Sequence, residues 1–217
     1  MKYQVQAGDT LSALAERFYG DARRHRAISA ANDLANPDHL VVGQELLIPY
    51  VTYRHRVQLG DTKQQLAQLF YGDPTMSEVF EIPNGAAQRD LIVGEWLLIP
   101  DLANASGHTV VAGETFEALA ERWYGDRFLW PIIAIANHVT DPEPVPGTVL
   151  LQPRLNWRHD VDAGDTLWQL AEYVYGPGGA ARTRHMVQTV AGANLIDDPD
   201  VIHVGQRLYF PSFDPGD

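Results

Sequence analysis

The sequence predicts an α+β protein of four similar units, each a two-stranded antiparallel sheet covered by two helices. The first observation is a repeat: "GDTLSALAERFYGD", which begins at Gly8, recurs with changes at Gly60, Gly113 and Gly164 of the 217-residue chain. The second is the nearly constant spacing of these glycines, 52, 53 and 51 residues, which is typical of tandem supersecondary units. The third is the order of patterns within a unit, where two helical patterns lie between two short apolar strands.

Further landmarks recur in every unit. Each has a tyrosine eleven residues after the first glycine, then an asparagine, a second glycine and a proline. In chain order these are Tyr19, Tyr71, Tyr124 and Tyr175; Asn32, Asn84, Asn137 and Asn194; Gly43, Gly94, Gly147 and Gly205; Pro49, Pro100, Pro153 and Pro211. We therefore expect repeat 1 at residues 1–50, repeat 2 at 51–102, repeat 3 at 103–155 and repeat 4 at 156–217.

The first strand and helix of repeat 1 follow from local patterns. "YQVQAG" alternates, which predicts a strand with Tyr3 and Val5 on one face. Asp9 or Thr10 then suits a helix N-cap, because its side-chain oxygen can accept from a free backbone N–H. Apolar residues follow at helical spacing, and Gly20 is expected to end the helix in a left-handed conformation. We expect Leu14 and its counterparts Leu66, Leu119 and Leu170 to be buried.

The second half of the repeat is expected to return the chain to the sheet. "ARRHRAISAAN" predicts a second helix with an apolar face that includes Ala27 and Ile28, and "LVVGQELLIP" predicts a turn at Gly43 and a second strand. Repeat 2 diverges, because Pro83 interrupts its second helix. Repeat 4 carries an insertion around "GPGGAARTRH".

These residues resemble the LysM family of small carbohydrate-binding modules, whose order is also βααβ. The resemblance rests on "VQAGDTLSALA", "AAN" and "LVVGQELLIP" in repeat 1 and on "VDAGDTLWQLA" and "VIHVGQRLYFP" in repeat 4. It covers almost the whole chain as four tandem copies. The "YGD" ending also resembles a LysM variety found in phage tails and contractile-injection baseplates.

The resemblance implies a shallow glycan groove between the turn after the first strand and the loop after the second helix. The implied groove residues are Gly8, Asp9, Thr10, Leu11, Asp33, Leu34, Ala35 and Asn36 in repeat 1, and Asp165, Thr166, Leu167, Leu195, Ile196 and Asp197 in repeat 4. An equally good interpretation is that "GDT" only turns the chain and caps a helix. The groove positions differ between repeats, and repeat 2 is the least suited to sugar.

Composition excludes several functions. The chain has 16 basic and 28 acidic residues, a net charge of −12 spread over all repeats, so nucleic acid and anionic membranes are not expected partners. No cysteine is present, which excludes disulfides, and no apolar run could span a bilayer. The start, "MKYQVQAGDT", lacks an apolar signal core, so synthesis in the cytoplasm without a signal peptide is expected.

Neither catalysis nor metal binding is expected. The sequence has no phosphate loop, nucleophile elbow or zincin spacing, so we expect a protein that is not an enzyme and has no cofactor or metal. His55, His108 and His159 share one repeat position with Tyr3, which indicates a packing or edge contact rather than a metal ligand. The repeated tyrosines and most tryptophans are expected to pack.

Two functions remain. The favoured interpretation is a structural adaptor with protein partners in a larger assembly, such as a phage-tail-like or contractile injection baseplate particle. The alternative is binding of peptidoglycan, chitin or another glycan that contains N-acetylglucosamine (GlcNAc). The short linkers "YVTY", "DLANASG" and "RLNW" lack flexible-spacer composition and favour the adaptor. We also expect neighbouring repeats to pack together and bury residues such as Val51 and Leu155.

Overall fold

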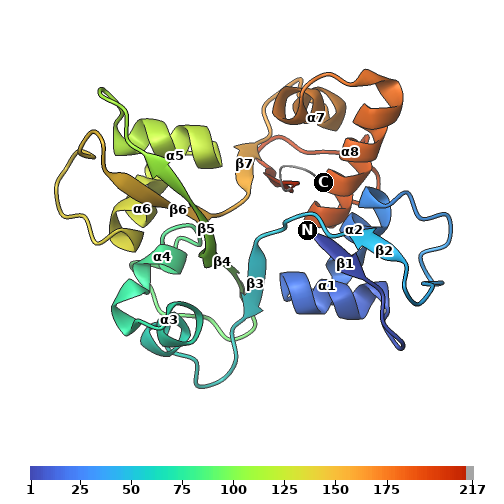
Figure 1. The fold of residues 1–217 in the computed structure, drawn as a ribbon, viewed down its shortest axis with the longest axis horizontal. Coiled ribbons are helices and arrows are strands. Elements are labelled where there is room, and N and C mark those ends of the chain that lie inside the picture. The colour runs from blue at the N-terminus through green and yellow to red at the C-terminus, as the bar shows by residue number, and fades with distance from the viewer. Residues whose placement is uncertain (214–217) are drawn as a thin grey trace. The chain divides into compact units, whose positions relative to one another are not determined.

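The computed structural model describes residues 1–213 and confirms the α+β class (Figure 1). Two-stranded sheets pair in the order β1–β2, β3–β4, β5–β6 and β7–β8, with one pair in each repeat. The first three pairs are antiparallel, and in the first of them Tyr3 lies opposite Leu46. None of the helices in this part of the chain is long and apolar enough to cross a membrane.

Repeats 1 and 2 share one order of elements. Repeat 1 comprises β1 (Lys2–Gln4), α1 (Leu11–Tyr19), the 3₁₀ helix η1 (Ala22–Arg24), α2 (His25–Ala31) and β2 (Glu45–Leu47). Repeat 2 comprises β3 (Tyr53–Arg56), α3 (Lys63–Tyr71), η2 (Pro74–Met76), α4 (Glu78–Glu81) and β4 (Trp96–Ile99). The short α4 ends just before Pro83, as the sequence predicts.

Repeat 3 keeps that order and repeat 4 changes it. Repeat 3 comprises β5 (Asp101–Thr109), α5 (Phe116–Tyr124), η3 (Arg127–Leu129), α6 (Trp130–Ala136) and β6 (Val149–Arg154). Its first strand, β5, thus begins before residue 103, the predicted start of the repeat. Repeat 4 comprises β7 (Trp157–Asp160), α7 (Leu167–Tyr175), α8 (Gly179–Asn194) and β8 (Arg207–Phe210). The insertion of repeat 4 therefore becomes the first part of one long helix, α8, in place of a 3₁₀ turn and a short helix.

The threonine of each repeat caps the first helix. Thr10 Oγ1 accepts from the Ala13 N–H at 3.1 Å, and the threonines of the other repeats do the same. Gly20 ends α1 in the left-handed region with φ of 69°, where a side chain would be strained. Leu14 and its three counterparts are at most 7% exposed, as the sequence predicts.

The repeated asparagine joins the second helix to the second strand. In repeat 1, Asn32 Nδ2 donates to the Ile28 and Leu47 carbonyl oxygens, and Asn32 Oδ1 accepts from the Leu47 N–H. Asn84, Asn137 and Asn194 make the same three hydrogen bonds in their own repeats. This asparagine is therefore a structural residue that locks the helix to the sheet.

The repeated tyrosine closes the other end of the core. The Tyr19 hydroxyl donates to the Pro49 carbonyl oxygen at 2.9 Å, and Tyr124 and Tyr175 donate to the matching proline carbonyls. Burial raises the pKa of Tyr19 and of Tyr175 well above the usual range. The predicted structural role of this position is confirmed.

Two tryptophans, Trp123 and Trp130, also pack against the core of repeat 3, whereas Trp168 is 36% exposed.

The repeats pair in a way the sequence did not predict. Repeats 1 and 4 form one compact unit, and repeats 2 and 3 form another. The expectation that sequence neighbours pack holds for repeats 2 and 3, but repeat 1 packs against repeat 4, which is the most distant repeat along the chain. Val51 and Leu155, beside the joints, are buried, but in the cores of repeats 1 and 3, respectively.

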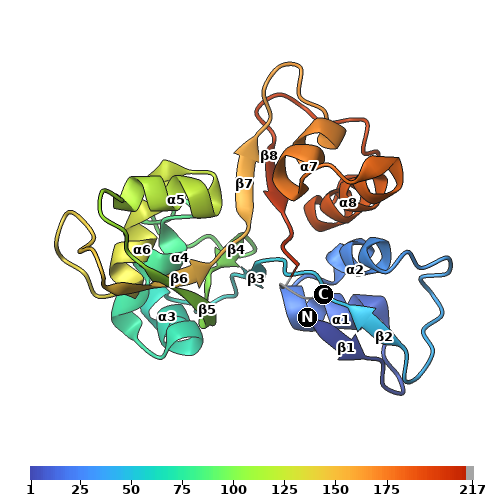
Figure 2. The same ribbon diagram turned by 45° about the horizontal axis from the view of Figure 1, so that its top comes forward.

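Within the first unit, α2 and α8 lie side by side (Figures 1 and 2). A methyl group added at Gly192 would lie 2.6 Å from the Ala27 backbone nitrogen, so the two helices touch through their backbones. Ala193 of α8 belongs to the apolar core of repeat 1. In the second unit, α4 packs against α6 through an apolar cluster that includes Met76, Val79 and Ala136.

Candidate functional site

In repeat 1, hydrogen bonds within the repeat occupy the polar side chains of the turn after the first strand. Asp9 Oδ2 accepts from the Gln6 N–H and from the Tyr3 hydroxyl, each at 2.7 Å. These bonds, first the backbone one and then that of Tyr3, hold the pKa of Asp9 below its usual range. Thr10 caps α1, as described above. The capping interpretation therefore accounts for the side chains of both implied groove residues.

The other repeats build the same turn with histidine in place of tyrosine. The Nε2 atoms of His55, His108 and His159 lie 2.7 Å from the carboxylates of Asp61, Glu114 and Asp165, respectively. A histidine N–H and a tyrosine hydroxyl can each donate to a carboxylate. The shared position is therefore an edge contact that holds the turn, as the sequence indicated.

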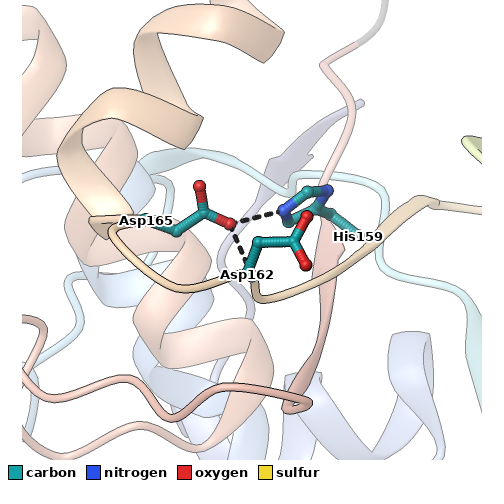
Figure 3. Close-up of side chains that lie close together, drawn as sticks. All are labelled: His159, Asp162 and Asp165. Carbon is teal, nitrogen blue, oxygen red and sulfur yellow. Dashed lines mark hydrogen bonds and ion pairs between the residues drawn. The ribbon is translucent and has the colours of Figure 1, made fainter.

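In repeat 4, Asp162 joins this pair (Figure 3). His159, Asp162 and Asp165 each offer an atom that could bind a metal ion, within 4.8 Å of one another. Asp165 Oδ2, however, already accepts from His159 and from the Asp162 N–H. These two bonds, that of His159 first, lower the pKa of Asp165. Because repeats 2 and 3 show the same bonds, the arrangement is explained as a turn.

Two implied groove leucines lie in the core. Leu11 is 3% exposed and Leu167 is 2% exposed, so neither side chain can cover a sugar face. Gly8 is exposed with φ of 90°. In repeat 4, Thr166 caps α7 through the Gln169 N–H. The turns of both repeats thus offer mainly backbone groups to a ligand.

The loop after the second helix is more accessible. In repeat 1, Asp33, Ala35 and Asn36 are exposed, and Leu34 is half-buried against the core. Asn36 Oδ1 accepts from the Asp38 N–H.

The matching loop of repeat 4 has exposed and buried side chains. Leu195 is 36% exposed and Ile196 is 6% exposed. Asp197 is exposed, and its Oδ1 accepts from Arg26 Nη1 of repeat 1 at 2.8 Å. The loop of repeat 4 is therefore bonded to helix α2 of repeat 1.

These loops share a backbone shape that their sequences conceal. The residue after the repeated asparagine of each repeat has a positive φ: Asp33 48°, Gly85 61°, His138 53° and Leu195 59°. A left-handed conformation at an ordinary side chain is strained. The sequence differences at this position therefore do not imply different loop folds.

A cavity lies between α2 and α8, beside these loops. Its volume is about 460 Å³, and it is partly open to solvent. Its lining includes Ser29, Asp33 and Leu34 of repeat 1 and Gln188, Ala191 and Asp197 of repeat 4. The structure thus brings together three of the implied groove residues, from two different repeats.

The sequence does not reveal the cavity, because the cavity depends on the pairing of repeats 1 and 4. A signal was present two residues before the repeated asparagine. Repeats 1 and 4 have the small Ala30 and Gly192 there, whereas repeats 2 and 3 have Ile82 and Ile135. Small residues at this helix position allow two helices to approach closely. Repeats 2 and 3 have isoleucine at the position instead.

The fold and these surfaces define a tandem-repeat protein whose small βααβ modules expose short polar loops. Residues 3–49, 108–153 and 159–211 match the LysM domain, and the chain therefore belongs to the LysM domain family. The three matches correspond to repeats 1, 3 and 4. Repeat 2 lies outside them, although it has the same order of elements.

Relatives share parts of this chain. The chain is 48% identical over 141 residues to "Esterase Rv1288" of Mycobacterium tuberculosis H37Rv, a match that covers 64% of this chain and 30% of that protein. It is 45% identical over 49 residues to "Potassium binding protein Kbp" of Escherichia coli O6:H1, covering 22% of this chain and 33% of that protein. The chain thus spans about a third or less of these curated relatives.

Among solved structures, the spore cortex-lytic enzyme SleL of Bacillus megaterium is similar to part of the chain. The identity is 30%, with a TM-score of 0.27, and the match covers 48% of this chain and 23% of SleL.

Proposed function

We propose that this protein binds glycans that contain GlcNAc, such as peptidoglycan or chitin, and that it does so without catalysis. The observation that carries the proposal is the match of three repeats to LysM, a binding domain. Several linked copies would add avidity, because each further site binds at the high effective concentration set by the first. The net charge of −12 favours a ligand that is not a polyanion.

Repeat 2 is, on this proposal, a fourth and divergent LysM copy with a structural role. Its Asn84 and His55 make the bonds of the other repeats. Lys63 stands at the position of the buried Leu11 and Leu167, and its Nζ donates to Glu81 Oε2 and to the Ala86 carbonyl oxygen, each at 2.7 Å. This lysine therefore ties the first helix to the loop that would otherwise face a sugar.

The esterase relative is consistent with separate binding and catalytic parts. The shared part is only 30% of that protein, so most of it lies outside the match. We infer that the shared part contributes attachment to a glycan and that ester hydrolysis belongs to the remainder of that relative. The present chain would then place itself, or whatever it is joined to, on a glycan surface.

A structural adaptor is the second candidate. The fixed pairing of repeats within each unit favours it, because an adaptor must hold its contacts at constant positions. None of the relatives described above is named as a phage-tail or baseplate component. Glycan binding is therefore the better supported function.

Sedimentation with insoluble glycans tests the proposal. The purified protein should be removed from solution by peptidoglycan sacculi and by chitin, and soluble chitotetraose should release it. Cellulose, which has the same linkage but lacks N-acetyl groups, is the matched control and should leave it in solution. If the protein binds neither sacculi nor chitin at protein concentrations of tens of micromolar, the proposal is rejected.

A further inference from the structure

We propose that the cavity between α2 and α8 is a composite site that takes one GlcNAc oligosaccharide and needs both repeat 1 and repeat 4. This inference rests on the proposed function and locates it. It differs from a groove within a single repeat, because the cavity lies at the junction of two repeats.

The first support is the fixed geometry of the junction. Gly192 of α8 lies so close to Ala27 of α2 that no Cβ fits between them. Ala193, the next residue, is 1% exposed in the core of repeat 1. Arg26 Nη1 also donates to Asp197 Oδ1 at 2.8 Å, near the cavity. The two walls of the cavity therefore belong to one packed unit, and the site is formed before any ligand arrives.

The second support is the identity of the loops that meet there. Asp33 and Leu34 follow the second helix of repeat 1, and Asp197 lies in the matching loop of repeat 4. The described lining includes neither the turn at residues 8–11 nor the turn at residues 164–167. Pairing thus brings the more accessible half of two implied grooves into one cavity.

The third support is the chemistry of the lining. Ser29, Asp33 and Gln188 offer a hydroxyl, a carboxylate and an amide, which suit sugar hydroxyl and acetamido groups. Ala30 and Leu34, which are both half-buried, offer small apolar surfaces for the flat faces of pyranose rings.

The charges of the lining residues disfavour the binding of polyanions. Arg26 is the single Arg or Lys side chain among the described lining residues, and its guanidinium pairs with Asp197. Asp33 adds a further negative charge. A cavity with this balance suits a neutral ligand better than a phosphate-bearing one.

The second unit supplies an internal comparison. At the positions of Ala30 and Gly192 it has Ile135 and Ile82. Ile135 packs on the apolar cluster between α4 and α6, and Ile82 packs on the core of repeat 3. Bulky side chains therefore occupy the junction of repeats 2 and 3, whereas the junction of repeats 1 and 4 leaves a cavity with polar side chains beside its close helix contact.

The test is a titration of the whole protein with chitotetraose, followed by ¹⁵N NMR and calorimetry. Amide signals of Ser29 and Ala30 in α2 should shift together with those of Gln188 and Ala191 in α8, with one common midpoint. Ala30→Ile, which copies the residue of repeat 3, should weaken this event at least tenfold. Ala118→Ile, the same change at an exposed position of α5, is the matched control and should leave it unchanged.

Gln188→Ala keeps the inference testable if Ala30→Ile does not fold, because Gln188 is exposed and its replacement leaves the core intact. It should also weaken binding. If the wild type sediments with sacculi or chitin but the α2 and α8 amides do not shift, the composite site is wrong and the proposed function stands. The same holds if Ala30→Ile and Gln188→Ala both bind as the wild type does. A wild type that binds neither the insoluble glycans nor chitotetraose overturns both.

Discussion

Gly192 and Ala27, which are far apart in the sequence, are in backbone contact. A Cβ at Gly192 would lie 2.6 Å from the Ala27 nitrogen and 2.6 Å from the Arg26 carbonyl carbon. Neither atom is the end of a side chain that could rotate away. This contact explains why the first and last repeats form one compact unit although two complete repeats separate them along the chain.

Gly192→Ala should therefore separate or distort the helix pair. Helix propensity alone would favour alanine by about 1 kcal/mol, but a methyl group forced against backbone usually costs about 1–3 kcal/mol. We expect a net loss of stability in the unit formed by repeats 1 and 4. Hydrogen exchange should show faster opening of α2 and α8, while the amides of repeats 2 and 3 serve as the internal control. Unchanged exchange in α2 would show that the helices are not in contact.

Asn137→Ala tests the asparagine that locks helix to strand. Asn137 donates to the Ile133 and Leu151 carbonyl oxygens at 2.8 Å and accepts from the Leu151 N–H at 2.6 Å. Because a net hydrogen bond contributes about 0.5–1.5 kcal/mol and lost partners add a cost, we expect a loss of about 2–4 kcal/mol.

Urea unfolding of the two units would measure this loss for the second unit. Asn104→Ala in the same repeat is the control, since Asn104 is exposed and bonds only locally to Asp101. Equal unfolding midpoints for the two variants would contradict a structural role for Asn137.

The left-handed position after each asparagine gives a reciprocal pair of substitutions. His138→Gly should stabilise repeat 3 by up to about 1 kcal/mol, because glycine adopts a φ of 53° without strain. Gly85→Ala should destabilise repeat 2 by about 1–2 kcal/mol, because Gly85 has a φ of 61°. Thermal unfolding of both variants measures the effect, and two shifts of the same sign would argue against a shared loop conformation.

Local features of this fold could be predicted from the sequence, because a repeat displays them four times. The N-capping threonine, the buried leucine at Leu14 and the strand order each depend on residues close in sequence. The pairing of repeats 1 and 4 depends on Gly192, which lies against the backbone of Arg26 and Ala27 in a distant helix, and such a contact leaves no period to detect. Sequence also could not decide the roles of Asp9 and Thr10, since capping and sugar binding use the same side chains.

The carboxylate of the first turn should make stability depend on acid. Glu114 accepts from the Val111 N–H and from His108, and Arg122 Nη2 lies 2.8 Å from its other oxygen. These groups, with the backbone bond first, lower the pKa of Glu114 from 4.5 to about 2. A group whose pKa is lower in the folded state stabilises the fold above the unfolded pKa, and that contribution is lost as pH falls through the folded pKa. The wild type should therefore lose this part of its stability between about pH 4.5 and pH 2.

Glu114→Gln should be less stable at pH 7 and should lose less stability on acidification, as measured by urea midpoints across this range. Glu143→Gln, which removes the same charge from an exposed loop, should keep the acid dependence of the wild type. If Glu114→Gln also keeps it, the turn carboxylate does not contribute to the acid sensitivity of the fold.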